Sequence, residues 1–266
     1  MLIAGVDEAG RGPLAGPVIS AAVILNPKKK IQGLRDSKLL TLAQRESLFE
    51  KICSHAIAWS VGRAEVDEID SLNILQASLL SMQRALDALS IQPARAMIDG
   101  IHAPKVTIPT QCIIDGDRLE PAISAASIIA KVIRDREMLE LDRQFPGFGF
   151  AQHKGYGTDI HMKALRILGP CLIHRRSFSP VRIVLESGLL YDRKEGLFYH
   201  ETFIANRAGN IKTNANANSN ANSNANANSK ANKKAKIRRN GFVASASFSN
   251  QASTPIIGFM PCASAA

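Results

Sequence analysis

Four acidic side chains lie where they could hold metal ions. Each follows a short apolar run typical of a β-strand, at residues 2–6, 94–98 and 112–114. The four are Asp7, Glu8, Asp99 and Asp117. Acids at the ends of neighbouring strands converge in space, and their repulsion is unfavourable unless a cation lies between them. Magnesium and manganese prefer such oxygen ligands, and a four-acid cluster with two such ions suits cleavage of a phosphodiester bond.

A second interpretation treats the same acids as parts of ordinary turns. The Asp-Gly pair at residues 99–100 and the Gly-Asp pair at residues 116–117 are each usual in turns. Asp7 and Glu8 could simply end a solvated strand. The positions of the acids therefore favour a metal site over turns only slightly.

The segment Gly10-Arg11-Gly12 comes shortly after the first two acids. Its two glycines allow the backbone to approach a ligand closely. A tight turn after a strand would have the same composition, but the adjacent acids favour a ligand-binding role.

Two further side chains are candidates for substrate contact. Tyr156 lies in a loop flanked by glycines, an unusual position for a tyrosine that serves only the core. Lys38 could contact a backbone phosphate, and a salt bridge near a helix is an almost equal alternative.

Other polar residues are assigned no catalytic role. The spacing of His153, His161 and His174 does not make a metal motif, so we expect hydrogen-bonding or substrate-side roles. Arg134 and Asp135 are adjacent on a predicted helix and cannot face each other, so we expect both to be structural.

Alternating strand and helix signals predict the elements that position these residues. Apolar runs at residues 2–6 and 18–25, joined by a Gly/Pro-rich segment, indicate antiparallel neighbouring strands. Thr41 and Gln44 have the spacing of a capping box. Further strands are expected at residues 56–61, 94–98 and 112–114, and helices at residues 41–53, 72–89 and 121–141. Interleaved strands and helices predict an α/β layered domain with a mixed sheet, in which the leucines of residues 72–89 belong to the core.

Composition locates most of the charge outside this domain. The chain has 266 residues, 45% of them hydrophobic, and a formal net charge of +10 from 33 basic and 23 acidic side chains. Residues 207–266 contain eight of the basic and none of the acidic side chains, which leaves 25 basic and 23 acidic before them. Charge alone therefore does not identify the predicted domain as a nucleic-acid binder.

The composition also changes along the chain. We expect a catalytic domain over residues 1–190, an extension of uncertain role over residues 191–206 and a low-complexity basic tail over residues 207–266. The Asn/Ala/Ser repeat at residues 214–228 has too little apolar surface to offset its ordering entropy, so we expect disorder there. A solvated tail without a role is favoured over an arm that binds nucleic acid.

The cysteines and the N-terminal sequence indicate the cellular compartment in which the protein is expected. Four cysteines lie far apart without a CxxC pair, as expected of buried or free thiols in a reducing compartment. They are Cys53, Cys112, Cys171 and Cys262. No signal peptide and no apolar run of membrane-spanning length are visible. We therefore expect a cytoplasmic protein without a membrane partner.

The motifs of residues 2–186 closely resemble those of the type 2 ribonuclease H family, in particular its bacterial ribonuclease HII branch. In chain order they are Asp7-Glu8-Ala9-Gly10-Arg11-Gly12-Pro13, Asp36-Ser37-Lys38, Asp99-Gly100, Gly116-Asp117, Ser124-Ala125-Ala126-Ser127, Arg134-Asp135, His153-Lys154-Gly155-Tyr156-Gly157-Thr158 and His174-Arg175-Arg176-Ser177-Phe178. The opening and Ser-Ala-Ala-Ser motifs are the most specific.

The resemblance implies both a fold and an activity. It implies a ribonuclease H-like mixed sheet flanked by helices, with a small C-terminal helical part. It implies an endoribonuclease that depends on Mn2+ or Mg2+. Such an enzyme hydrolyses the RNA strand of RNA/DNA hybrids and cuts at ribonucleotides embedded in DNA. The products would carry 3′-hydroxyl and 5′-phosphate ends, and we expect a monomer.

The resemblance also assigns roles to individual residues. It gives metal binding to Asp7, Glu8, Asp99 and Asp117. It gives detection of the ribose 2′-hydroxyl to the segment at residues 10–12, and packing on the sugar at the RNA-to-DNA junction to Tyr156. Two alternatives remain: a nuclease of the same fold that acts on DNA alone, and a non-catalytic module that binds hybrids.

Overall fold

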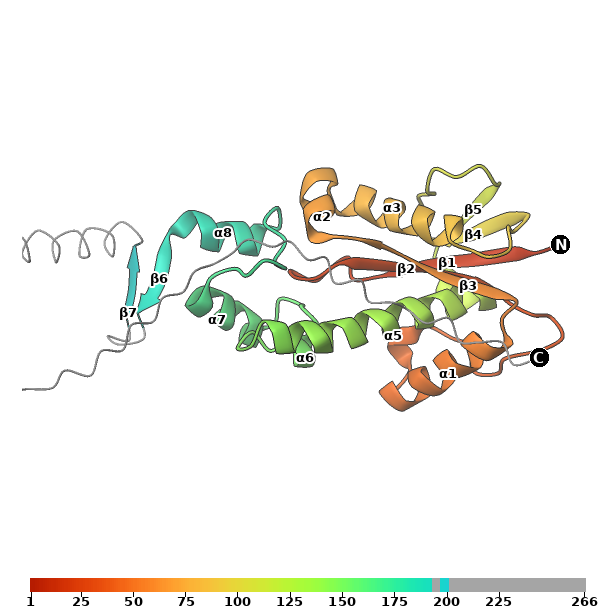
Figure 1. The fold of residues 1–266 in the computed structure, drawn as a ribbon, viewed down its shortest axis with the longest axis horizontal. Coiled ribbons are helices and arrows are strands. Elements are labelled where there is room, and N and C mark those ends of the chain that lie inside the picture. Colours follow the sequence, from red (N-terminus) through yellow and green to blue (C-terminus); the bar gives the residue numbers. More distant parts are fainter. Residues whose placement is uncertain (193–196, 201–266) are drawn as a thin grey trace, which may run out of the picture. The chain divides into compact units, whose positions relative to one another are not determined.

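The computed structural model of the protein describes residues 1–192 and 197–200 (Figure 1). Its strands are β1 (Ile3–Ala9), β2 (Val18–Ile24), β3 (Ala58–Ala64), β4 (Arg95–Asp99), β5 (Thr110–Ile113), β6 (Leu189–Asp192) and β7 (Leu197–His200). Its helices are the 3-10 helix η1 (Ser37–Leu39), α1 (Leu42–His55), α2 (Val66–Leu72), α3 (Ile74–Asp87), α4 (Gly116–Leu119), α5 (Pro121–Gln144), α6 (Phe150–His153), α7 (Asp159–Leu168) and α8 (Ser179–Ser187).

The first five strands form one mixed sheet in the order β3-β2-β1-β4-β5. Strand β2 is antiparallel to both β1 and β3, whereas β4 is parallel to both β1 and β5. The predicted antiparallel pairing of the first two strands and the predicted mixed sheet are therefore confirmed. Strands β6 and β7 form a separate antiparallel pair.

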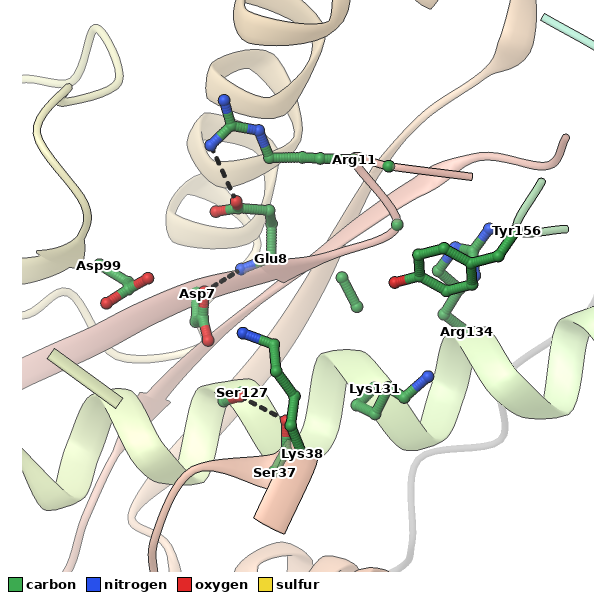
Figure 2. A pocket seen from close by; sticks show the side chains of 13 residues that line it. Asp7, Glu8, Arg11, Ser37, Lys38, Asp99, Ser127, Lys131, Arg134 and Tyr156 are labelled. Atoms are coloured by element: carbon green, nitrogen blue, oxygen red, sulfur yellow. Dashed lines mark hydrogen bonds and ion pairs between the residues drawn. The ribbon is translucent and has the colours of Figure 1, made fainter. Parts of the chain in front are cut away.

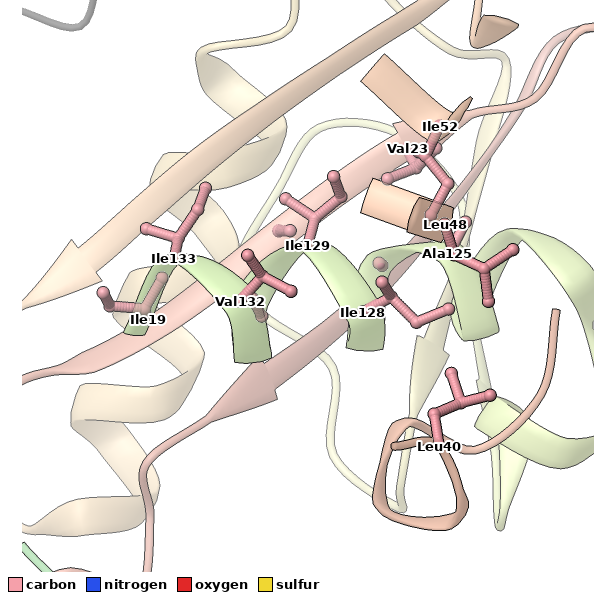
Figure 3. Close-up of a cluster of buried hydrophobic side chains, with 13 residues drawn as sticks. Ile19, Val23, Leu40, Leu48, Ile52, Ala125, Ile128, Ile129, Val132 and Ile133 are labelled. Carbon is pink, nitrogen blue, oxygen red and sulfur yellow. The ribbon is translucent and has the colours of Figure 1, made fainter. Parts of the chain in front are cut away.

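Helices cover both faces of the five-stranded sheet (Figure 1). On one face, buried side chains of β2, α1 and α5 pack together, among them Ile19, Ile52 and Ile129 (Figure 3). On the other face, α3 contributes Met82 to a second cluster with Ile98 of β4. Strands β1 and β2 thus lie in the interior of the domain, where apolar burial stabilises them on both sides.

Glycine allows α5 to pack very close to β1. A Cβ atom on Gly5 would lie less than 3.0 Å from backbone atoms of Ala122 and Ile123, so only glycine fits there. The close packing places the first turns of α5 beside the C-terminal end of β1. Ser127 of α5 consequently lies near the Asp7 carboxylate and lines the same pocket.

The local rules predicted some element ends and missed others. Thr41 and Gln44 form the predicted capping box at the start of α1. The helix expected from residue 72 instead begins at Ile74, because Asn73 has φ 73° and caps it. Leu72 ends the preceding helix α2, which was not predicted, and is 42% exposed, so the core stripe is shorter than expected.

The first strand is longer than its apolar run. It was expected to end at Val6, but β1 continues to Ala9 because Glu8 pairs with Ser20 and Ala9 with Ile19 in β2. Asp7 and Glu8 therefore lie inside the strand rather than after it.

The helices α6, α7 and α8 make up the predicted C-terminal helical part. None of the described helices is long and apolar enough to cross a membrane. The predicted tail, residues 207–266, lies outside the described residues.

Candidate functional site

The two acids of β1 point to opposite sides of the sheet, as successive residues of a strand do (Figure 2). Asp7 is buried and points towards α5, where the nearby Ser127 hydroxyl partly offsets the rise in its pKa. Ser127 is in turn within 2.8 Å of the Ser37 hydroxyl. Glu8 points away from α5 and accepts a hydrogen bond from Arg11 at 3.3 Å. The Asp7 carboxylate also accepts the backbone N–H of Glu8 at 2.7 Å.

The third acid, Asp99, ends the neighbouring strand β4. Val6 and Ile98 pair in the parallel register of β1 and β4, so Asp7 and Asp99 follow at the same end of the two strands. The Asp99 Oδ1 accepts the backbone N–H of Gly116 at 2.8 Å. This bond attaches the start of α4 to the end of β4.

The fourth acid, Asp117, lies in α4 directly after that glycine, and its side chain is buried. Asp115 precedes the helix with φ 54°, a left-handed conformation that turns the chain back towards the sheet. Asp117 is thus positioned by the turn and by the Gly116 hydrogen bond, not by the end of the predicted strand itself.

The acids influence one another electrostatically. Burial raises the pKa of Asp7 well above its ordinary value, and the charges of Glu8 and Asp99 raise it further. Burial also raises the pKa of Glu8; Arg11 opposes this and Asp99 adds to it. The pKa of Asp117 is raised by burial, then by the charges of Asp36 and Asp99. The charge of Asp99 therefore acts on all three other acids, and a cation among them would relieve the repulsion.

The donor set fits a hard divalent cation. Within the described part of the chain, no three Asp, Glu, His or Cys side chains form a complete cage for one metal ion. Magnesium rarely uses such a cage: it keeps several waters and is held by one or two carboxylates together with substrate phosphates. Buried carboxylates that repel one another supply oxygen ligands of this kind.

Asp7, Glu8 and Asp99 line one pocket, and Asp117 does not border it. The segment Gly10-Arg11-Gly12 forms a wall of this pocket. Gly10 has φ 101°, and a Cβ atom there would overlap the side chain of Arg134. A Cβ atom on Gly12 would lie 3.4 Å from the Tyr156 ring, so the ring packs directly beside this glycine. The structure thus brings together two features that are far apart in the sequence. Tyr156 is 45% exposed and lines the pocket (Figure 2).

Lys38 lines the pocket from the side of α5 (Figure 2). It lies in η1, and its backbone N–H donates to the Asp36 carboxylate at 2.9 Å. Asp36 is itself buried and forms an ion pair with Arg118 at 3.4 Å. The Lys38 side chain forms no ion pair among the described residues, which leaves its ammonium group available to an anionic ligand.

Three pocket residues had been given no role from the sequence: Ser37, Ser127 and Lys131. Ser37 and Ser127 belong to the family motifs, but nothing local showed that they would lie beside the acids. Arg134 also borders the pocket, and it donates to the backbone carbonyls of Pro17, Ala15 and Lys154, in agreement with the predicted structural role.

The three histidines of the C-terminal part are buried and hydrogen-bonded, and none of them lines this pocket. This agrees with the hydrogen-bonding role expected for them. They are His153, His161 and His174.

Comparison with known proteins gives consistent matches over the same part of the chain. A family model described as Ribonuclease HII matches residues 4–181. The Ribonuclease HII of Coxiella burnetii (strain RSA 493 / Nine Mile phase I) is 60% identical over 182 residues, which cover 68% of this chain and 90% of that protein.

Solved structures are similar as well. The crystal structure of ribonuclease H2 from Pyrococcus horikoshii OT3 has 31% sequence identity and a TM-score of 0.59, and the match covers 70% of this chain and 98% of that one. A structure of Bst-RNase HIII in complex with Mn2+ has 17% identity and a TM-score of 0.56 and covers 70% of each chain, which supports the fold alone.

Proposed function

The chain belongs to the ribonuclease HII family, and from this premise we propose that its four acids form the catalytic centre of an endonuclease that cuts RNA in RNA/DNA hybrids and at single ribonucleotides embedded in DNA. Membership makes the protein a metal-dependent nuclease and a hydrolase. The assignment of the centre to particular residues, the two-ion mechanism and the ends produced are the proposal.

The observation that carries the proposal is that Asp7, Glu8 and Asp99 converge in one pocket at the same end of β1 and β4, with Asp117 following Gly116, which is bonded to Asp99. Three separate segments supply these acids, and burial and repulsion raise the pKa of three of them. Structural carboxylates are usually paired with bases, whereas of these four only Glu8 has such a partner, Arg11, among the described residues. Such an arrangement is unfavourable for folding and suits a site that binds cations.

The four acids would hold two divalent ions, Mg2+ or Mn2+. When bound, such ions supply Lewis-acid stabilisation of negative charge and make water a stronger acid. Asp7 is oriented by the hydrogen bond from the Glu8 backbone N–H to its Oδ1, so its carboxylate would present a ligand oxygen in a defined direction. Hydrolysis that breaks the bond to the 3′ oxygen would leave a 3′-hydroxyl and a 5′-phosphate.

The neighbouring wall would select ribose. Backbone groups of residues 10–12 border the pocket beside the acids, where they could reach a 2′-hydroxyl. The exposed Tyr156 ring beside Gly12 would pack on the sugar at the junction. Lys38 would contact a phosphate of the same strand. Together these groups favour RNA-containing duplexes over DNA alone.

The test uses one duplex with a single ribonucleotide and the same duplex without it. We expect cleavage only of the first, only with Mg2+ or Mn2+, and loss of cleavage in EDTA. Asp7→Asn is the inactive control. Cleavage of the all-DNA duplex would support a DNA nuclease, whereas binding of hybrids without turnover at any metal concentration would support a non-catalytic module.

A further inference from the structure

Arg175 is a fully buried cation whose partners are backbone carbonyls. It lies between α7 and α8, and its guanidinium donates to Gly10 O at 2.6 Å and Arg11 O at 2.9 Å. It also donates to Gly16 O at 2.7 Å and Pro17 O at 3.3 Å. Among the described residues it forms no ion pair with a carboxylate. A buried charge needs such a shell of acceptors, because the loss of water is otherwise strongly unfavourable.

These bonds fix the direction of two peptide groups at the pocket wall. In a planar trans peptide the C=O and the following N–H point in opposite directions. The carbonyls of Gly10 and Arg11 point at Arg175, so the N–H groups of Arg11 and Gly12 point away from it. Neither N–H has a hydrogen-bond acceptor within the part of the chain that the structure describes. Both residues line the pocket, so the two donors are available to a ligand there.

His174, the preceding residue, begins a chain of hydrogen bonds that ends at Tyr156. The Cys171 N–H donates to His174 Nδ1 at 3.0 Å, so the proton of a neutral His174 is on Nε2. That nitrogen lies 3.0 Å from His161 Nε2, which must therefore be the acceptor. The His161 proton is then on Nδ1, which donates to the Tyr156 carbonyl at 2.9 Å. Burial lowers the pKa of His174 to about 4 and agrees with a neutral ring.

The backbone of residues 174 and 175 also binds the segment that follows residues 10–12, and that segment in turn binds the loop that carries Tyr156. Ala15 and His174 form an isolated β-bridge, and Arg175 N–H donates to Leu14 O at 2.8 Å. Leu14 N–H donates to Gly155 O at 2.8 Å, directly before Tyr156. The pocket wall and the tyrosine loop are thus supported from one place in the chain.

We propose that His174 and Arg175 are positioning residues for ribonucleotide recognition: Arg175 orients the N–H groups of Arg11 and Gly12, and His174, through His161, fixes Tyr156. This inference rests on the ribose-selecting role proposed above for residues 10–12 and Tyr156. It separates recognition from metal binding, since neither side chain contacts the four acids.

The role proposed for Arg175 is tested by measuring binding, which does not depend on turnover. In an Asp7→Asn background, the affinity for a duplex with one ribonucleotide is compared with that for the all-DNA duplex. Arg175→Lys keeps the charge but loses the planar fork of five donors. We expect the ratio of the two affinities to fall roughly two- to tenfold for each N–H contact that loses its orientation.

Arg176→Lys is the matched control for the Arg175→Lys binding experiment. It is the same change one residue later, at an exposed side chain whose backbone N–H binds Asp70. We expect it to leave the affinity ratio unchanged. If Arg175→Lys does not fold, Arg175→Gln, which keeps two N–H donors without a buried charge, replaces it. Equal ratios in the Arg175 and Arg176 variants would overturn the assignment of Arg175.

The role proposed for His174 is tested by measuring cleavage. We expect His174→Ala to lower kcat/KM for a single embedded ribonucleotide more than for a long hybrid, and His174→Gln, which can restore a donor towards His161, to recover part of the loss. Phe148→Leu is the control, because Phe148 packs on His174 without taking part in the hydrogen-bond chain. Identical behaviour of His174→Ala and Phe148→Leu would refute the relay.

Failure of this inference can be told apart from failure of the proposed function. If Tyr156→Ala itself leaves selectivity unchanged, the role proposed for Tyr156 is wrong, and if the Asp7→Asn protein binds the two duplexes equally well, the ribose-selecting role of residues 10–12 is wrong. If Tyr156→Ala reduces selectivity while the His174 and Arg175 variants do not, only the positioning role is wrong.

Discussion

Gly5→Ala should destabilise the fold from a position that carries no chemistry. Its Cβ atom would lie less than 3.0 Å from three backbone atoms of Ala122 and Ile123, whereas carbon atoms normally pack at about 3.5–4.0 Å. The shortest of these distances, 2.1 Å to the carbonyl carbon of Ala122, is about 1.4 Å below that range, so helix α5 would have to move away from β1 by about 1 Å or more. Overpacking of a core usually lowers the free energy of unfolding by about 1–3 kcal/mol, and we expect the upper end because the obstacle is backbone.

The displacement should also reach the catalytic centre, because α5 carries Ser127 to Asp7. Urea unfolding of the metal-free protein measures the stability change, and cleavage of a hybrid at saturating metal measures the second effect. A stability loss of about 3 kcal/mol corresponds to a fall in Tm of roughly 6–12 °C for a domain of this size. We expect kcat to fall as well at temperatures where the variant stays folded.

Gly12→Ala is the matched control. Its Cβ atom would make an ordinary contact of 3.4 Å with the Tyr156 ring, and its φ is not in the left-handed region. Both substitutions reduce the entropy of the unfolded chain equally, so the difference between them isolates the overlap at Gly5. We expect Gly12→Ala to stay within about 0.5 kcal/mol of the original stability. A Gly5→Ala protein that unfolds at the same urea concentration as Gly12→Ala would show that α5 adjusts freely and that this reasoning is wrong.

Four further predictions concern the site and the C-terminal residues. Asp7→Asn should abolish cleavage while leaving hybrid affinity largely intact, as measured by single-turnover assays and binding on the same substrate, because most affinity comes from backbone contacts; near-normal turnover would contradict the metal assignment. Tyr156→Ala should reduce cleavage at a single ribonucleotide more than cleavage of a long hybrid, by an amount of about 1–3 kcal/mol in kcat/KM if the ring stacks on the substrate; equal losses would make Tyr156 a support of its loop. Truncation after His200 should leave kcat unchanged and weaken substrate binding only at low salt, because eight basic side chains are removed; lost turnover at both low and near-physiological salt would place residues after 200 in the active enzyme. In metal-free protein, Asp7 should stabilise the fold fully below its ordinary pKa of 3.8 and lose that contribution as pH rises through its raised pKa. In urea titrations, the wild type should therefore lose more stability than Asp7→Asn from about pH 4 upward. Parallel curves would mean that the Asp7 pKa is not raised.

Local sequence rules predicted elements well where one short segment determines the structure. The Thr41–Gln44 capping box is complete within four residues, and it forms as expected. The extent of β1 was underestimated because its last residues are held by pairing with β2, and the apolar pattern ends at Val6. Helix α2 was missed because the leucine period runs past Asn73, whose positive φ interrupts the chain.

In the candidate site, too, features set by a short segment were predicted and features set by distant contacts were not. The four acids were selected from their position after apolar runs, and the structure brings them to one end of the sheet. The groups around them come from distant segments: the Gly116 N–H binds Asp99, and Ser127 lies near Asp7 on a helix whose close approach Gly5 permits. Arg175 looked like one of several basic residues near the end of the domain, since nothing in its neighbourhood shows that its acceptors are carbonyls of residues 10–17.

The bonds of Arg175 have a consequence for the order of assembly. They join positions separated by 158 to 165 residues, among the most distant pairings in the described structure. Contacts of such long range form late, because the intervening chain must first be brought together. On a ribosome, a nascent chain that has emerged as far as α5 holds all four acids and Ser127, yet lacks the guanidinium that orients the backbone of residues 10–12. If the proposed roles hold, a growing chain acquires the proposed metal ligands well before the group proposed to orient its ribose-recognising backbone.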